Sequence, residues 1–397
     1  MLGGRQEKDR NQKEAFIEKL SGKPMKAHLL SFGLSVILSL NPPQSQGIRT
    51  TSDGVKYKVE TVVEHLEVPW SLVFDGEGNL YFTERPGRLQ VLKHGGKTPT
   101  LIARIVDVLH RGEGGLMGLA LHPEFDKNQY IFLSYTFKYR NGAANRVVRY
   151  RLKEWTLSDR LEIVPHLPGS GVHNGCRIRF GPDRKLYVTT GDAADREIAQ
   201  DLGSLGGKIL RLNDDGSIPA DNPDPKSPIF AFGVRNPQGI AWRPTSGEMF
   251  ETEHGPSGFD GPGGGDEVNI IARGKNYGWP TIHHNQTTRG MESPLREYTP
   301  AIAPASAMFY LGEAFKEFKG DFFFGCLRGE RIQRIVLAGA SPPRIVREEP
   351  LLEGEFKRIR DVIEGPDGSI YFCTSNRDGR ASPFGSDDRI LRIVPAR

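Results

Sequence analysis

One local pattern recurs along the chain, and this repetition restricts the possible folds more than any other feature. Each copy has an apolar strand, a turn rich in Gly, Asp and Pro, and a second strand rich in aromatic residues. The copies are Trp70–Glu84, Leu116–Tyr135, Arg177–Thr190, Gly239–Glu253, Ala305–Cys326 and Arg360–Thr374. Their second strands are anchored at Leu80, Ile131, Leu186, Met249, Phe322 and Ile370, which lie 48 to 73 residues apart.

This spacing predicts the architecture. A step of that length holds about one four-stranded propeller blade. Apolar and polar positions alternate within the copies, and no long segment has the 3.6-residue period of a helix. The 47 Gly and 28 Pro also favour a turn-dense fold. We therefore predict an all-β chain in which residues 55–397 form a six-bladed β-propeller catalytic domain. Two stacked sandwiches would also supply many short strands, but not this regular repeat.

The N-terminus has the layout of an export signal. Residues 1–24 are polar and charged, and we interpret them as disordered or as an over-extended reading frame. Met25 and Lys26 then precede an apolar run over 29–40, which suits a secretory signal and is too short to span a membrane. A buried helix is the alternative. We expect a signal peptide over 25–47 and a periplasmic or secreted mature protein with no membrane span.

Composition excludes several classes of function. The 53 basic and 49 acidic residues give a net charge of +4, and no basic helix is present, so we expect no nucleic-acid partner. The three cysteines, Cys176, Cys326 and Cys373, lack metal-ligand spacing and allow at most one internal disulfide. No dinucleotide fingerprint, P-loop, nucleophile elbow or zincin motif occurs.

Loops from every blade of a propeller surround one channel mouth, so residues scattered along the sequence can converge there. His173, in a Gly-rich loop, could accept a proton near pH 7, or only form hydrogen bonds. Glu113 offers a carboxylate in a similar loop. The backbone carbonyls of Gly255 and Pro256 could hold a hard cation, or simply form a turn. A converging set of arginines would cradle a planar, multiply anionic ligand, and the candidates are Arg235, Arg328, Arg358 and Arg360.

Taken together, these stretches resemble the soluble quinoprotein glucose/sorbosone dehydrogenase family, and most of all its aldose sugar dehydrogenase branch. The family fold is a six-bladed propeller. The matching segments occur in family order across about residues 60 to 395. They are Gly112–Phe125, His173 with Phe180–Asp183 and Thr190–Asp192, Gly207–Pro223, Arg235–Gly239, Glu253–Pro256, Gly265–Ile271, Asn276–Pro280 and Arg358–Val362.

The resemblance implies pyrroloquinoline quinone (PQQ) as cofactor, with Ca²⁺ beside it. His173 matches the general base, and Arg235 matches the arginine over the quinone carbonyls, with Asn236 as its neighbour. Gly255 and Pro256 match the positions whose carbonyls ligate calcium. The remaining implied cofactor-binding residues are Arg358 and Arg360, which grip the carboxylates, Arg328, where the family usually has lysine, and Glu113, which replaces a glutamine. In some members the region of Asp266, Glu267 and Tyr277 holds further calcium.

The sequence departs from the glucose-specific branch on the sugar side. Val172 stands where that branch has an aspartate orienting the base, so His173 needs another partner or must be oriented by the backbone. Glu197 replaces a second glutamine near the sugar, and Thr299–Ala301 lies where that branch has an aromatic and a hydroxyl residue against the cofactor. We therefore expect the cofactor and calcium site to be kept while the sugar side is changed.

The expected function is PQQ- and calcium-dependent oxidation of aldoses at C1 to lactones. Electrons would pass to a soluble or quinone-type acceptor, and the protein would be a monomer or homodimer. Two alternatives remain: a calcium-dependent sugar lactonase, and a non-catalytic propeller that binds sugars or proteins. The lactonase would hold its metal with Glu, Asn and Asp side chains, whereas this sequence offers carbonyls and an arginine cradle.

Overall fold

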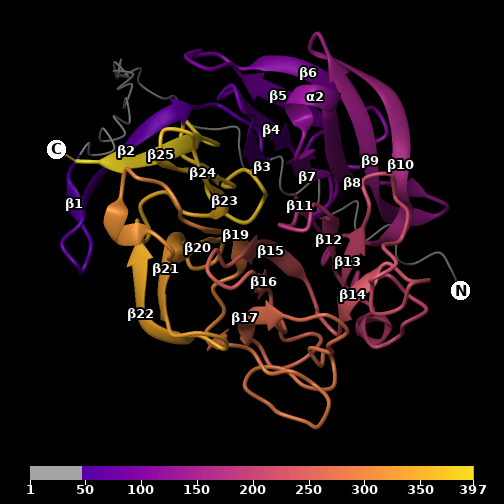
Figure 1. The fold of residues 1–397 in the computed structure, drawn as a ribbon. Coiled ribbons are helices and arrows are strands. Elements are labelled where there is room, and N and C mark those ends of the chain that lie inside the picture. The colour runs from indigo at the N-terminus through magenta and orange to yellow at the C-terminus, as the bar shows by residue number, and fades with distance from the viewer. Residues whose placement is uncertain (1–46, 397) are drawn as a thin grey trace, which may run out of the picture. The chain divides into compact units, whose positions relative to one another are not determined.

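The computed structural model describes residues 47–396. The predicted N-terminal extension and all of the predicted signal peptide except Gly47 lie outside these residues. The described chain forms six antiparallel sheets around a central axis, which confirms the predicted six-bladed propeller (Figure 1). Consecutive first strands contact one another around this axis, and the later strands of each blade lie progressively outward.

Five blades are built from consecutive strands. The first has β3 (Pro69–Phe74), β4 (Leu80–Glu84), β5 (Arg88–Leu92) and β6 (Thr100–Arg104). The second has β7 (Leu116–Leu121), β8 (Tyr130–Tyr139), β9 (Gly142–Lys153) and β10 (Thr156–Gly169). The third has β11 (Gly175–Phe180), β12 (Leu186–Thr190), β13 (Lys208–Leu212) and β14 (Ile229–Phe232). The fourth has β15 (Pro237–Trp242), β16 (Met249–Glu253), β17 (Asp266–Ile271) and β18 (Arg296–Tyr298), and the fifth has β19 (Pro304–Phe309), β20 (Phe322–Cys326), β21 (Arg331–Ala338) and β22 (Arg344–Leu351).

The sixth blade joins the two ends of the described chain. Its inner strands are β23 (Ile359–Glu364), β24 (Ile370–Thr374) and β25 (Ile390–Pro395), and β2 (Lys56–Val63) pairs antiparallel with β25. The short β1 (Arg49–Thr50) pairs with β2. Buried Arg334 of β21 strengthens this closure because it forms ion pairs with Asp53, in the β1–β2 turn, and with Asp321 and Glu349.

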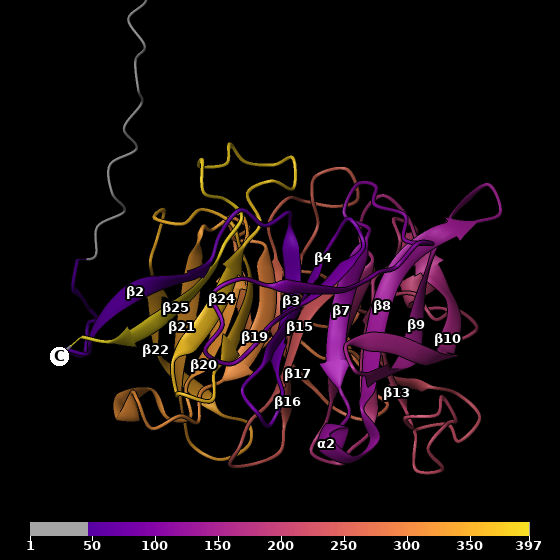
Figure 2. The ribbon, with the colours of Figure 1, turned by 90° about the horizontal axis from the view of Figure 1, so that it is seen from above.

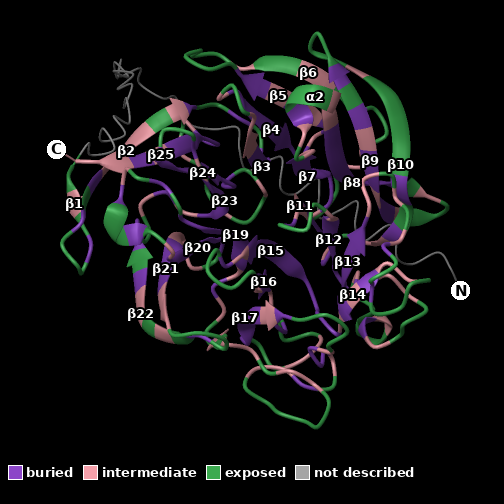
Figure 3. Ribbon diagram, in the orientation of Figure 1, coloured by how far each residue is buried: buried purple, intermediate pink, exposed green. Residues whose placement is uncertain are grey.

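Apolar packing lies between the blades. Each junction between neighbouring blades has its own buried cluster, and the inner strands are mostly buried (Figure 3). In the junction of the fourth and fifth blades, Phe250 packs edge-on against Phe309, with ring centroids 5.1 Å apart. Such aromatic pairs contribute roughly 0.5–1.5 kcal/mol beyond the burial of their area. The three cysteines are buried free thiols within this packing.

One end of the propeller gathers the candidate residues. Neighbouring strands of a blade run antiparallel. The loop that precedes a first strand therefore lies at the same end of the propeller as the loop between the second and third strands. The β24–β25 loop lies at this end, whereas helix α2 (Phe125–Asn128), between β7 and β8, lies at the other (Figure 2). All six first strands have a register shift near their start, at this end. Such bulges re-aim side chains at the rims of barrels.

The remaining elements are two 3-10 helices, η2 (Arg196–Ala199) and η3 (Lys316–Phe318). No helix within residues 47–396 has the length and apolar character needed to cross a membrane.

Candidate active site

His173 lies in the loop between β10 and β11, and its side chain is buried. Its backbone is in the left-handed region, with φ 53°, where non-glycine residues are uncommon. Gly191 permits this geometry, because a Cβ atom at that position would lie only 1.9 Å from the His173 carbonyl oxygen. A second contact fixes the loop from outside: Glu113 Oε2 accepts the backbone N–H of His173 at 3.0 Å. The loop therefore holds the imidazole in one place.

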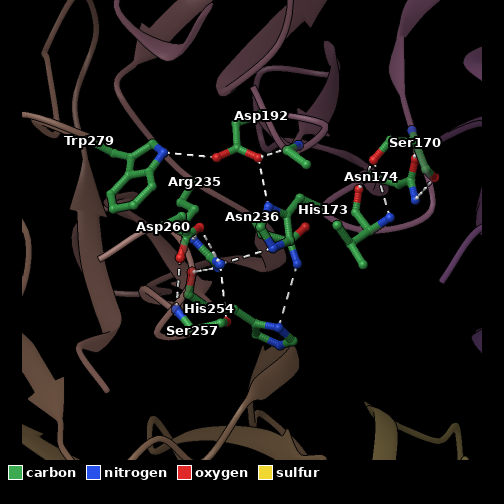
Figure 4. Close-up of polar contacts among 12 residues, drawn as sticks. Ser170, His173, Asn174, Asp192, Arg235, Asn236, His254, Ser257, Asp260 and Trp279 are labelled. Carbon is green, nitrogen blue, oxygen red and sulfur yellow. Dashed lines mark hydrogen bonds and ion pairs between the residues drawn. The ribbon is translucent and has the colours of Figure 1, made fainter. Parts of the chain in front are cut away.

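Asp192 orients the imidazole from the loop after β12. Its Oδ1 lies 2.7 Å from His173 Nδ1, and its Oδ2 accepts the indole N–H of Trp279 at 2.9 Å (Figure 4). The backbone N–H of Ala194 also donates to Oδ1. Because a carboxylate accepts and does not donate, Nδ1 carries the proton of the neutral ring. Asp192 is thus the partner that His173 needed in the absence of an aspartate at position 172.

Arg235 faces the other ring nitrogen. Its Nη2 lies 2.9 Å from His173 Nε2 and 2.7 Å from Asp260 Oδ2, and it also donates to Ser257 Oγ (Figure 4). Nη1 donates to the carbonyl oxygen of His254 at 3.0 Å. A guanidinium group can only donate hydrogen bonds, so Nε2 must accept one. The imidazole thus carries its proton on Nδ1, and its Nε2 lone pair accepts from the arginine.

The loop between β16 and β17 covers this pair. Phe259 stacks nearly parallel on the His173 ring, with centroids 5.9 Å apart and an interplanar angle of 19°, while its own side chain is 69% exposed. Asp260 anchors the loop through its ion pair with Arg235 and accepts the backbone N–H of Ser257. His173 and Arg235 thus lie beneath a loop that offers an exposed aromatic ring.

A cavity adjoins this network, and its wall includes three of the predicted site residues: Glu113, Arg358 and Arg360. His254 lines the cavity, and its carbonyl oxygen accepts a hydrogen bond from Arg235. This residue therefore links the cavity wall to the His173–Arg235 pair. Burial lowers the pKa of His254 to about 3, so this imidazole stays neutral. The full set of lining residues is Trp70, Arg85, Gly112, Glu113, Met117, Asn174, Gly175, Gln238, His254, Leu327, Arg358, Arg360, Asp378 and Arg380.

The other predicted residues divide into two groups. Asn236 is buried beside the cavity wall, where its Oδ1 accepts from the Gly175 backbone and from Gln238 Nε2. By contrast, Arg328 and Glu197 are exposed and are not among the residues that line the cavity. The structure brings together the His173–Arg235 pair and the Arg358–Arg360 wall, and leaves these two side chains at the surface.

The Gly255–Pro256 turn packs tightly against the end of its own loop. A Cβ atom at position 255 would lie 2.1 Å from the Gly265 carbonyl oxygen, so only glycine fits there. Asp266 accepts the Gly255 N–H at 2.8 Å, and the Pro256 carbonyl oxygen accepts from Gly264 at 3.2 Å. Within residues 47–396, no donor contacts the Gly255 carbonyl oxygen. This oxygen is therefore available to a cation.

Buried acids surround this turn. Burial raises the pKa of Asp266 and raises that of Glu267 to about 8. Burial also raises the pKa of Glu253, which lies opposite Glu267 in the sheet. A cation at the turn would favour the charged form of these carboxyl groups and so oppose the rise in their pKa values.

The glucose/sorbosone dehydrogenase family matches residues 66–390. The chain belongs to this family. Aldose sugar dehydrogenase YliI of Escherichia coli K12 is 32% identical over 346 residues, covering 81% of this chain and 91% of that protein.

Solved structures share the whole propeller. A Thermus thermophilus protein described as an oxidoreductase (glucose dehydrogenase) is 42% identical with a TM-score of 0.78, covering 85% of this chain and all of that one. The PQQ-bound form of aldose sugar dehydrogenase from Streptomyces coelicolor is 32% identical with a TM-score of 0.76, covering 86% and 98%. The family predicted from sequence motifs is thus confirmed.

In this family member, several polar contacts of the site were not predicted from sequence. Asp192 ends a matching segment that implies no role for it, and Asp260 lies in no matching segment. Both follow or interrupt Gly-rich turns, where an aspartate is ordinary. One signal could have identified Asp192: it lies two residues after the end of a second strand, and so at the end of the propeller that also holds His173. Arg85 and Arg380, both in the cavity wall, carry no local signal.

Proposed function

We propose that this chain is a PQQ- and calcium-dependent dehydrogenase that oxidises aldose sugars at C1 to lactones. One observation carries the proposal: a neutral His173, held by Asp192 and contacted by Arg235, lies beside a cavity with four arginines in its wall. Membership of the glucose/sorbosone dehydrogenase family and the PQQ-bound Streptomyces coelicolor relative support it.

The residues of the cavity fit a multiply anionic cofactor. The Nε atoms of Arg85 and Arg360 are buried without a hydrogen-bond partner, although guanidinium groups normally find one. Trp70 and Met117 add apolar surface for a planar ring system. We assign Arg358 and Arg360 to the cofactor carboxylates and Arg235, with Asn236 behind it, to the side that faces the base.

His173 would remove the proton of the C1 hydroxyl through Nε2. Asp192 then stabilises the imidazolium form, because its carboxylate lies 2.7 Å from the protonated Nδ1. When bound, PQQ would supply the quinone carbonyl that accepts the C1 hydride. Loss of this hydride and of the hydroxyl proton converts the C1–OH group into the lactone carbonyl, so that atoms and electrons balance.

Arg235 has two tasks in this scheme. In the present geometry its N–H group occupies the Nε2 lone pair of His173, so it must turn aside before that nitrogen can accept a substrate proton. Its positive charge then remains next to the reacting atoms, where it stabilises developing negative charge. General bases placed in this way contribute roughly 10²–10⁴-fold to rate.

We assign the calcium to the carbonyl oxygens of Gly255 and Pro256. Removing the metal with a chelator is expected to weaken PQQ binding by at least about tenfold, since a divalent cation contributes charge to holding an anionic ligand. Isothermal titration with PQQ before and after chelation measures this, and adding Ca²⁺ back should restore the affinity. Unchanged PQQ affinity in protein shown to be free of metal would contradict the calcium assignment.

The lactonase alternative needs a cluster of metal-binding side chains, and the described residues hold one candidate group: His173, Asp192 and Asp260. A guanidinium nitrogen of Arg235 lies 2.9 Å from the imidazole and 2.7 Å from the Asp260 carboxylate. A cation there would meet the like charge of Arg235. The geometry therefore favours the dehydrogenase. A purely binding propeller would have no use for a base oriented by a buried carboxylate.

We also propose that the segment over 25–47 directs export of the protein and is removed from the mature form. The charged start and apolar run of that segment support this. N-terminal sequencing of the mature protein is expected to begin near residues 44–47, and recovery of the run over 29–40 would contradict export by this signal.

A further inference from the structure

Two buried arginines of this propeller lack a carboxylate partner. Among residues 47–396, nine arginines are buried. Seven of them form ion pairs: Arg177, Arg211, Arg235, Arg243, Arg334, Arg358 and Arg389. The other two, Arg85 and Arg360, form none. A buried charge without a partner is costly, so the exceptions call for an explanation.

Both exceptions lie in the wall of one cavity. Arg85 follows β4 and is only 3% exposed, and its Nη2 donates to the carbonyl oxygen of Gly112. Arg360, on β23, donates only to Gln238 Oε1 and lies over the Trp70 ring. In both residues Nε has no partner. Burial lowers the pKa of Arg85, and that of Arg360 to about 9, and the nearby charges of Asp378 and Glu113 offset this only in part.

The remaining charges of the cavity wall neutralise one another. Arg358 pairs with Asp378 at 2.7 Å, and Arg380 pairs with Glu113 at 2.7 Å. These two pairs use every carboxylate in the wall. Two positive charges are therefore left over, on Arg85 and Arg360, and an uncharged aldose would not compensate them. Two carboxylate groups of one ligand would compensate both charges.

We propose that Arg85 is a cofactor-binding residue that pairs, alongside Arg360, with a carboxylate group of PQQ. The proposal rests on the proposed function. It adds to the predicted arginine cradle a residue from the first blade, far in sequence from Arg360 of the sixth blade. Arg85 is preorganised for this task because its contact with Gly112 fixes the guanidinium before the ligand arrives.

The test compares PQQ affinity in wild type and Arg85→Gln, with Trp fluorescence as the readout since Trp70 lines the cavity. Gln keeps a donor for Gly112 but loses the charge. We expect PQQ to bind about 10- to 100-fold more weakly, as for the loss of a charge-assisted pair. The Tm of the cofactor-free variant should equal or exceed that of wild type, because an unpaired buried charge is removed.

A second ligand separates pairing from a structural role. The trimethyl ester of PQQ has no carboxylate charge, so wild type should prefer PQQ to the ester, and Arg85→Gln should lose much of that preference. Arg243→Gln is the matched control, since its guanidinium is also buried but is paired with Glu248 and does not line the cavity. We expect it to change PQQ affinity less than about threefold.

The outcomes are distinguishable. If wild type does not bind PQQ, the proposed function fails, whatever the variants do. If wild type binds and Arg85→Gln binds within twofold with the same preference over the ester, the role of Arg85 is wrong. If Arg85→Gln does not fold, Arg85→Lys decides: the loss of the planar fork should weaken PQQ binding several-fold, and an unchanged affinity overturns the proposal.

Discussion

Replacing His173 with Ala is expected to lower kcat by about 10²–10⁴-fold while PQQ affinity stays within a few-fold of wild type. The first effect follows from loss of the Nε2 lone pair that faces Arg235. The second follows because His173 is not among the residues that line the cavity. Dye-coupled turnover with an aldose, together with fluorescence titration of PQQ, measures both quantities. Added imidazole should restore part of the lost activity.

His122 provides a control for this variant. It follows the first strand of the second blade, at the end of the propeller that also holds α2. His122→Ala should therefore leave kcat near the wild-type value. A His173→Ala protein that turns over at a rate similar to wild type would remove His173 from the role of base.

Replacing Asp192 with Asn is expected to lower kcat by roughly two to four orders of magnitude, although the side chain keeps its shape. An amide can donate to Nδ1 and so favours the tautomer with the proton on Nε2. That tautomer cannot accept the substrate proton, and its N–H would also oppose the N–H groups of Arg235. The same substitution at the orienting aspartate of serine proteases lowers kcat by about 10⁴-fold.

Asp195→Asn is the matched control, because Asp195 lies three positions further on and is exposed. We expect its kinetics to match wild type. The amide oxygen introduced by Asp192→Asn can still accept the Trp279 indole N–H, so the Tm of this variant should fall only slightly. If kcat of Asp192→Asn stayed within about threefold of wild type, another group would have to set the tautomer of His173.

The repeating pattern predicted the blades closely. Strands begin at Leu80, Leu186, Met249, Phe322 and Ile370, as expected, and Ile131 is the second residue of β8. The alternation of apolar and polar residues predicts these strands because, within a blade, each strand pairs with a segment next to it in the sequence. The pairing of β2 with β25 was not predicted, since a strand at one end of the chain gives no local sign of a partner some 330 residues away.

The candidate site was predicted in part. His173 and Arg235 were both singled out and lie within hydrogen-bond distance. The partner of His173 was not, because Asp192 reads as a turn residue until the fold places it at the same channel end. Arg85 could not be found from sequence at all. What distinguishes it is burial without a counter-charge, and that property arises only from three-dimensional packing.

The most direct test of the proposed function is reconstitution of the metal-stripped protein. PQQ, Ca²⁺ and an aldose would be added singly and together, and dye reduction would be followed over a panel of aldoses, with sugar lactones assayed in parallel for hydrolysis. We predict dye reduction that requires all three components and yields the lactone. Lactone hydrolysis without PQQ, or protein that binds no PQQ at all, would contradict the assignment as a quinoprotein sugar dehydrogenase.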